Sequence, residues 1–158
     1  MCGIVGIINR LMGLNSLEVS DTTPLFMELY EGLFHLQHRG QDSVGIELFE
    51  NGPKCHIIKK LGLIHNLKTE FHNLTDIQQI AALGHIRYST NNGLNDHGEE
   101  YDKLAQIQPI YKKNHINPYN IHLCHNGHMI IDSELLDFCK EHNISTIYNS
   151  DSEAAKDF

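Results

Sequence analysis

Short apolar runs alternate with polar segments along the chain, and their spacing predicts a domain that mixes helices and strands. The first run, Gly3–Ile8, is rich in Ile and Val and predicts a strand that begins almost at the amino terminus. Leucine and aromatic residues then recur every three or four positions over about 24–38, which predicts an amphipathic helix. Thr23 suits its N-cap, Pro24 its first turn, and Gly40 its carboxyl-terminal stop.

Strand and turn patterns follow this helix. Val44–Phe49 and Cys55–Lys60 predict two strands, and Asn51-Gly52-Pro53 predicts the turn between them. Segment 66–79 is ambiguous and allows a short helix, and Ile80–Ile86 predicts another strand. The order of elements is that of a mixed, layered α+β domain. It differs from the alternation of strands and helices that is typical of a parallel sheet.

The second half of the chain carries weaker patterns. Residues 91–119 are polar and predict a long loop, which in a compact domain is usually functional. Asn126–Gly127 is a preferred hairpin turn, and it lies between the apolar runs Ile121–Cys124 and Met129–Ile131. The last predicted elements are a helix capped by Asp132 or Ser133 with Leu135, Leu136 and Cys139 on one face, and a short strand near Thr146–Tyr148.

The length, charge and hydropathy of the chain exclude some classes of protein and partner. A length of 158 residues suits one domain that buries a substantial core. The formal net charge of −8 repels phosphate backbones and anionic lipids, so nucleic acid and membranes are not expected partners. No basic leader precedes the first apolar run, and no run reaches membrane-spanning length. We therefore expect a soluble, cytoplasmic protein, with a homo-oligomer as an open possibility.

Cys2 offers the sharpest chemical possibility. If Met1 were removed, Cys2 would carry both a thiol and a free α-amine. An α-amine has a pKa of about 8, so it can act as the general base that activates a nucleophile on its own residue. Position alone favours the ordinary interpretation, in which Cys2 is simply the second residue. The four cysteines form no C-x-x-C pair of the kind found in zinc or redox motifs.

At three further places in the sequence, the residues have both a functional and a purely structural explanation. The side-chain amide of Asn126 and the backbone N–H of Gly127 provide two donors that suit an oxyanion, although a hairpin turn alone explains the pair. Arg87 ends an apolar run and suits a bidentate hold on a carboxylate, but a surface arginine is more common. Asp151 lies between two serines and also suits a helix cap.

Histidines and a cysteine gather near the same turn. His122, Cys124 and His128 would share one face of an unbroken strand, with His125 on the other face. Their spacing matches no common zinc pattern, and the Asn-Gly turn interrupts the strand. Ordinary hydrogen bonds are the favoured explanation, so neither a metal nor another cofactor is expected in this domain.

The order and wording of several segments resemble the class II glutamine amidotransferases, which are N-terminal-nucleophile hydrolases. Within that family they look most like the amidophosphoribosyltransferases of purine biosynthesis. The matching segments cover nearly the whole chain. They are Cys2–Gly6, His38–Gly45, Gly84–Thr90, Gln108–Pro109, His125–Gly127 and Ser150–Glu153.

The resemblance implies a layered αββα fold and hydrolysis of glutamine to glutamate and ammonia. It also implies a role for several side chains. Cys2 would be the nucleophile and its α-amine the base. Asn126 and Gly127 would form the oxyanion hole, Arg87 and Asp151 would bind the α-carboxylate and α-ammonium of glutamine, Arg39 would support the Cys2 loop, and Tyr88 would begin a loop over the substrate.

Two departures from the family pattern bear on this expectation. Gln106 stands where the family tends to have Asn, within a longer segment before Gln108. The family's glutaminase domain also continues past Ser150–Glu153, and a phosphoribosyltransferase domain follows it. We therefore expect residues 1–158 to be a C-terminally incomplete glutaminase domain, which needs such a domain or a partner chain to use the ammonia. The alternatives are another class II enzyme of the glucosamine-6-phosphate synthase type, or a silent fragment that binds glutamine or a partner chain.

Overall fold

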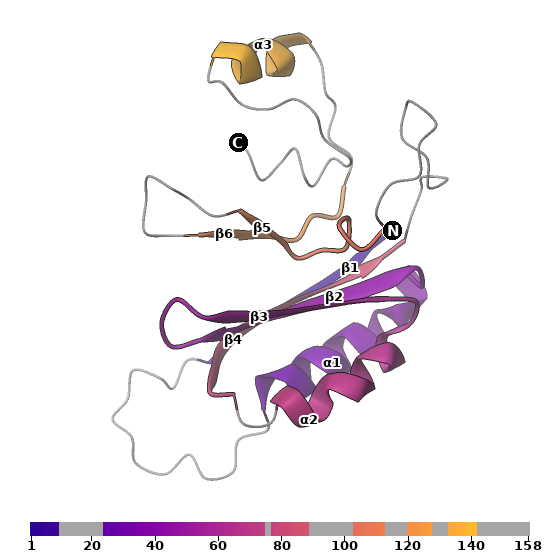
Figure 1. The fold of residues 1–158 in the computed structure, drawn as a ribbon. Coiled ribbons are helices and arrows are strands. Elements are labelled where there is room, and N and C mark those ends of the chain that lie inside the picture. Colours follow the sequence, from indigo (N-terminus) through magenta and orange to yellow (C-terminus); the bar gives the residue numbers. More distant parts are fainter. Residues whose placement is uncertain (10–23, 75–76, 89–102, 113–119, 128–132, 142–158) are drawn as a thin grey trace.

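The computed structural model describes residues 1–9, 24–74, 77–88, 103–112, 120–127 and 133–141, and these combine α-helices with antiparallel β-sheets (Figure 1). A four-stranded sheet, a smaller two-stranded sheet and three α-helices make up the described fold. The elements are β1 Gly3–Ile8, α1 Leu25–His35, the 3₁₀ turn Gln37–Arg39, β2 Ser43–Glu50, β3 Cys55–Leu61, the 3₁₀ helix Ile64–Glu70, α2 Phe71–Leu74, β4 Gln79–Arg87, β5 Ile110–Lys112, β6 Ile121–Leu123 and α3 Ser133–Glu141.

The larger sheet has the strand order β1-β4-β2-β3, and every neighbouring pair is antiparallel. Its register pairs Gly3 with Ile86, and Ser43 with Arg87. The beginnings of β1 and β2 therefore lie beside the end of β4, at one end of the sheet. This end of the sheet brings together residues that are far apart in the sequence, including the amino terminus (Figure 1).

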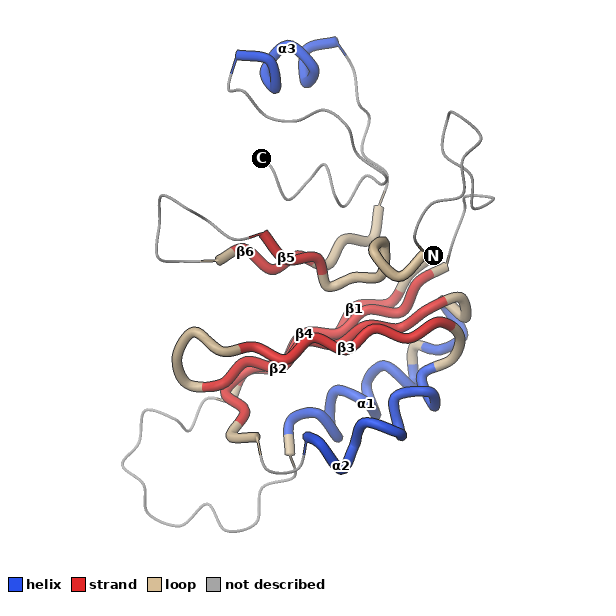
Figure 2. Tube along the Cα trace, viewed as in Figure 1, coloured by secondary structure: helices blue, strands red, loops and turns tan. Residues whose placement is uncertain are grey.

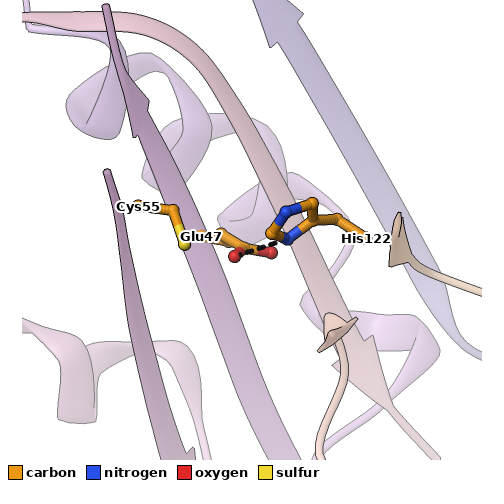
Figure 3. Close-up of side chains that lie close together, drawn as sticks. All are labelled: Glu47, Cys55 and His122. Carbon is orange, nitrogen blue, oxygen red and sulfur yellow. Dashed lines mark ion pairs between the residues drawn. The ribbon is translucent and has the colours of Figure 1, made fainter. Parts of the chain in front are cut away.

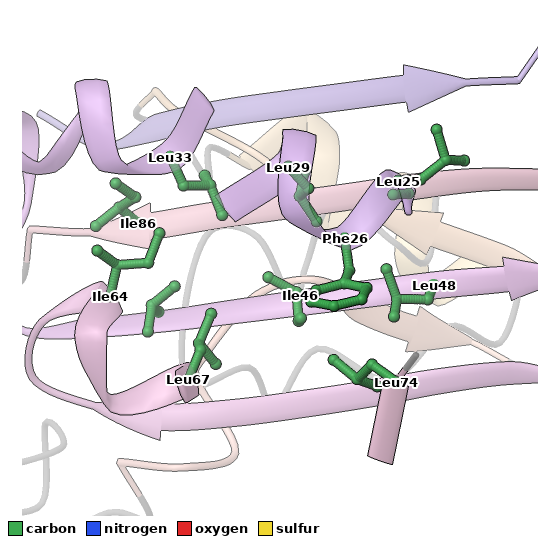
Figure 4. Packing of buried hydrophobic residues seen from close by; sticks show 12 residues of the cluster. Leu25, Phe26, Leu29, Leu33, Ile46, Leu48, Ile64, Leu67, Leu74 and Ile86 are labelled. Carbon is green, nitrogen blue, oxygen red and sulfur yellow. The ribbon is translucent and has the colours of Figure 1, made fainter. Parts of the chain in front are cut away.

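One face of this sheet packs on α1 and α2 and forms the hydrophobic core. Alternate side chains of β2 point to opposite faces, and Val44, Ile46 and Leu48 all point into the core. Leu29 and Leu33 of α1 are fully buried against them (Figure 4). Each such side chain contributes about 1.5–3 kcal/mol by leaving water. The core also includes Leu25, Phe26, Ile64, Leu67, Leu74, Ala82 and Ile86.

The other face of the sheet is covered by β5, β6 and the segment before them (Figure 2). Gln106, Ile107 and Gln108 are buried in that segment. Gly45 of β2 is what lets the segment approach, because a Cβ atom there would lie 2.0 Å from the backbone oxygen of Gln108. A larger residue at this position would push the two layers apart.

The structure confirms most of the predicted elements and changes the bounds of one. The strand Gly3–Ile8, the paired strands around Gly52, the strand through Ile80–Ile86 and the helix beginning at Ser133 are all present. The helix predicted over 24–38 is shorter, and α1 ends at His35.

Bonds of the i to i+3 type explain this early end. The amide of Leu36 donates to the Leu33 carbonyl, and that of Arg39 donates to the Leu36 carbonyl, which tightens the chain into a 3₁₀ turn. Pro24 occupies the cap position of α1, with no side-chain cap bond, instead of the first turn. Thr23 lies outside the described residues.

One further prediction is wrong in part, and two others fall on residues that the structure does not describe. The predicted loop 91–119 contains a strand, β5, within its described part. β6 pairs with β5 across this segment. The predicted partner of β6, Met129–Ile131, and the strand near Thr146–Tyr148 lie outside the described residues. Among the residues that the structure describes, no helix has the length and apolar character needed to cross a membrane.

Candidate active site

Cys2 directly precedes β1 at this end of the sheet, and Asn126 forms two hydrogen bonds with its backbone. The backbone N–H of Cys2 donates to Oδ1 of Asn126 at 3.2 Å. The side-chain amide Nδ2 of Asn126 donates to the Cys2 carbonyl at 3.1 Å. These bonds join residues 124 positions apart in the sequence. They place the amide of Asn126 directly beside the main chain of Cys2.

Arg39 binds the same carbonyl of Cys2. Its Nε donates to the Cys2 carbonyl at 2.9 Å, and a terminal guanidinium nitrogen lies 3.8 Å from the sulfur of Met1. The turn that carries Arg39 packs tightly on the end of β4, because a Cβ at Gly40 would lie 2.6 Å from the Arg87 carbonyl. The amide of Asp42 also donates to that carbonyl at 3.1 Å.

The thiol of Cys2 faces the residue that follows β4. Its Sγ lies 3.9 Å from the backbone oxygen of Tyr88, a weak thiol hydrogen bond at best. The Cys2 residue is half-buried, and the Tyr88 side chain is 54% exposed.

Arg87 ends β4 next to these residues and contacts a buried glutamine. Its guanidinium Nη2 donates to Oε1 of Gln106 at 2.5 Å. A guanidinium has five N–H donors, so one such bond leaves capacity for a carboxylate. Gln108 lies two residues further and accepts from the backbone N–H of His125 at 2.5 Å. Both glutamines tie the segment before β5 to the site.

His85 is a fully buried neighbour of this group. It lies two residues before Arg87 on β4, where alternate side chains share a face. Burial is the largest cause that lowers the pKa of His85 to about 4; the nearby Arg87 also lowers it, and a hydrogen bond with the His125 backbone partly opposes the shift. The imidazole is therefore neutral at pH 7, and it supplies no charge to the site.

The structure thus gathers most of the side chains that the sequence singled out. Cys2, Arg39 and Asn126 are in direct contact, and Tyr88 contacts the thiol of Cys2. Gly127 directly follows Asn126 and is exposed. Arg87 is adjacent through β4. Asp151 lies outside the described residues, as does His128.

Sequence reasoning gave no role to three polar residues that line this region. Gln106, Gln108 and His85 are 5%, 7% and 0% exposed, which is unusual for polar side chains. The two glutamines alternate with Ile107 and Pro109, and polar residues at alternate positions beside apolar ones are a signal that the loop prediction overlooked. His85 could be found only from its neighbours in space.

The amino-acid sequence is similar to those of known proteins over most of its length. An amidophosphoribosyltransferase from Pasteurella multocida is 32% identical over 135 residues, which is 85% of this chain and 22% of that protein. An amidophosphoribosyltransferase from Schizosaccharomyces pombe is 36% identical over 80% of this chain and 22% of its own length. The chain is similar to amidophosphoribosyltransferases. No family model matches the chain.

Two solved structures have a fold similar to that of this chain. Glutamine phosphoribosylpyrophosphate amidotransferase from B. subtilis, complexed with ADP and GMP, superposes with a TM-score of 0.55 at 30% identity. That match covers 79% of this chain and 24% of the other. A structure described as the allosteric regulatory enzyme of purine biosynthesis gives a TM-score of 0.58 at 29% identity. The chain therefore spans about a quarter of the length of these amidophosphoribosyltransferases.

Proposed function

We propose that the chain hydrolyses glutamine, with Cys2 as nucleophile after removal of Met1, as the glutaminase part of an amidophosphoribosyltransferase. The observation that carries this proposal is the paired contact between Cys2 and Asn126. It places a side-chain amide against the main chain of a cysteine that becomes amino-terminal when Met1 is lost. The similarity to amidophosphoribosyltransferases over most of the chain supports it.

The first step needs a base for the Cys2 thiol. With Met1 removed, the atom that now donates to Asn126 becomes the α-amine of Cys2. The Oδ1 of Asn126 accepts from that amine, so the amine lone pair is free to take the thiol proton. The thiolate then attacks the side-chain amide carbon of glutamine. Arg39 holds the Cys2 carbonyl, so the main chain stays in place when Met1 leaves.

The second step needs donors for the oxyanion that forms on the amide oxygen. A side-chain amide has two N–H donors, and one of those of Asn126 is used on the Cys2 carbonyl. The other N–H and the backbone N–H of the exposed Gly127 supply the oxyanion hole in this proposal. The α-ammonium of Cys2, which took the thiol proton, gives that proton to the amide nitrogen, and this nitrogen leaves as ammonia. Water then hydrolyses the thioester to glutamate and regenerates the thiol.

Recognition of glutamine falls to charges beside this pair. The proposal assigns the α-carboxylate to Arg87, which Gln106 orients, and the α-ammonium to Asp151. Tyr88 begins the segment that covers the substrate. A ligand that lacked either charged group would leave a site charge unmatched, and for that reason these contacts would set specificity.

The fold in this proposal is the layered αββα arrangement of N-terminal-nucleophile hydrolases. The helices, the two sheets and the match to longer amidotransferases support it. The partner that uses the ammonia is then a phosphoribosyltransferase domain or a separate chain carrying one. The relatives favour this over an enzyme of the glucosamine-6-phosphate synthase type.

The test is glutamate release from glutamine by the purified chain, with Cys2→Ala beside it and the amino-terminal residue identified by intact mass. The proposal expects a chain without Met1 that releases glutamate, and a Cys2→Ala variant that does not. A folded wild-type chain that has lost Met1 but releases no glutamate would refute activity of residues 1–158. It would leave a silent fragment that binds glutamine or a partner chain.

A further inference from the structure

Three side chains with metal-binding atoms meet between the two sheets, on the side of β2 away from the core. Glu47 of β2, Cys55 of β3 and His122 of β6 have ligand atoms within 4.8 Å of one another (Figure 3). The register explains the first two, because Cys55 pairs with Phe49, two residues along the same face from Glu47. His122 comes from the smaller sheet, so the cluster spans both layers.

Burial leaves the polar atoms of this cluster poorly hydrogen-bonded within the described part of the chain. Glu47 is fully buried, and among the described residues neither of its carboxylate oxygens has a hydrogen bond of acceptable geometry. The same holds for Nδ1 of His122, although this atom lies only 2.7 Å from Oε1 of Glu47. Burying a carboxylate is costly unless the group is paired or binds a metal, and the partners of Glu47 on the described residues, His122 and Cys55, are themselves metal-binding side chains.

We propose that Glu47, Cys55 and His122 form a binding site for one divalent transition-metal ion, with zinc the best match. Zinc takes cysteine sulfur, histidine nitrogen and carboxylate oxygen, whereas magnesium and calcium take oxygen ligands alone. An ion among these atoms would bind one oxygen of Glu47, the sulfur of Cys55 and one ring nitrogen of His122 at once. Three protein ligands leave the fourth tetrahedral position to a water molecule or another side chain.

A reactive cysteine is the main alternative for such a cluster, and the surroundings of Cys55 oppose it. Burial, followed by the neighbouring Glu47 carboxylate, raises the pKa of the Cys55 thiol to about 11. A thiol held in its protonated form is a poor nucleophile. A metal ion instead replaces that proton, which goes to solvent, and bonds the sulfur as thiolate.

The residues around His122 suit a fixed ligand. Its ring packs edge-on against Phe49, with 4.9 Å between the centroids, and lies tilted against Tyr111, with 5.1 Å between the centroids.

The position of the cluster gives the ion a structural role. β6 runs directly into His125 and Asn126, and Asn126 is bonded to Cys2. An ion that links β6 to β2 and β3 would fix the smaller sheet on the larger one. It would thereby hold Asn126 in place without touching the substrate. This role is independent of what the Cys2 site does, so glutamine hydrolysis and metal binding fail separately.

The experiment strips the 158-residue chain with a chelator and titrates it with zinc alone, following bound metal by mass spectrometry and folding by thermal melting. We expect about one zinc per chain and a higher melting temperature. Cobalt in place of zinc should give the thiolate-to-metal charge-transfer absorption of a bound sulfur. A folded wild-type chain that binds no zinc and shows no such band overturns the proposal.

Variants identify the ligands. Glu47→Gln, Cys55→Ser and His122→Gln should each lose the bound ion, and Cys55→Ser should also lose the charge-transfer band. An amino-terminal cysteine can chelate zinc by itself, so Cys2→Ala is the control that must keep the ion. Retention of zinc in all three ligand variants, or its loss in Cys2→Ala alone, would place the metal elsewhere and overturn the assignment. If a ligand variant fails to fold, the cobalt spectrum of Cys2→Ala decides.

Discussion

Acidification should weaken the fold through His85, whose ordinary pKa of 6.5 falls to about 4 because the side chain is buried. A lowered folded-state pKa means that the unfolded chain takes up the proton first. The contribution of His85 to stability is therefore fully present above pH 6.5. It is lost as the pH falls from there towards 4.

The size of the effect follows from the two pKa values. A difference of 6.5 − 4, at about 1.4 kcal/mol per unit, sets a limit of about 3 kcal/mol at low pH. At pH 5 the unfolded side chain is almost fully protonated and the folded one is almost neutral. The free energy of unfolding should therefore fall by about 2 kcal/mol between pH 7 and pH 5 through this residue alone.

Denaturant unfolding at pH 7 and pH 5 measures this, with His85→Gln as the variant that cannot titrate. The change in free energy of unfolding between the two pH values should be about 2 kcal/mol smaller in His85→Gln than in the wild type. The absolute stability of the variant does not matter, because only the pH difference is compared. His65→Gln is the matched control, because His65 is exposed, and it should keep the wild-type pH dependence.

Two results would refute this reasoning. Equal pH dependence in His85→Gln and wild type would mean that the burial of His85 does not depress its pKa. An imidazole signal of His85 that titrates near pH 6.5 in the folded chain, followed by nuclear magnetic resonance, would mean the same. A change confined to His65→Gln would assign the effect to a surface histidine.

Three further predictions follow from the site and the packing. Asn126→Ala should lower kcat for glutamate release by about 100-fold to 1,000-fold with little change in KM, because the proposed oxyanion donor is lost. Gly45→Ala should destabilise the chain, as a Cβ would lie 2.0 Å from the backbone oxygen of Gln108; thermal melting measures this, and Gly6→Ala, where the nearest atom would be 3.9 Å away, is its control. Leu29→Ala should cost about 2–5 kcal/mol in denaturant unfolding, because Leu29 is fully buried.

Each of these has an outcome that contradicts it. A large rise in KM with unchanged kcat in Asn126→Ala would make Asn126 a substrate-binding residue. Equal melting temperatures for Gly45→Ala and Gly6→Ala would mean that the segment before β5 does not press on β2. Met27, which is 39% exposed on the same helix as Leu29, provides the core control. A Met27→Ala variant as unstable as Leu29→Ala would refute the assigned burial.

The sequence by itself determined the elements whose pattern is strong and local. Gly3–Ile8 and Val44–Phe49 are short β-branched runs, and the leucine spacing of α1 has the helical period, so these were predictable without a fold. The bounds of α1 were not predictable, because 3₁₀ bonds near Leu36 compete with continued helix. The strand β5 was missed because three residues in a polar segment carry too little periodicity.

The candidate site was predictable as a set of residues but not as an arrangement. The sequence motifs identified Cys2, Arg39 and Asn126 as candidates, but only the antiparallel register places the start of β1 beside the end of β4. The contact of Cys2 with Asn126 then depends on β6 lying over that sheet. Hydrogen bonds between residues 124 positions apart produce no pattern in the local sequence.

The cluster of Glu47, Cys55 and His122 was decided by tertiary structure alone. In the sequence, the potential metal ligand next to His122 is Cys124, whereas the residues that meet His122 in the structure come from β2 and β3. Sequence spacing records which face of a strand a side chain occupies. Which strands then lie opposite each other is settled by how the two sheets bury their apolar faces, and this depends on the whole chain.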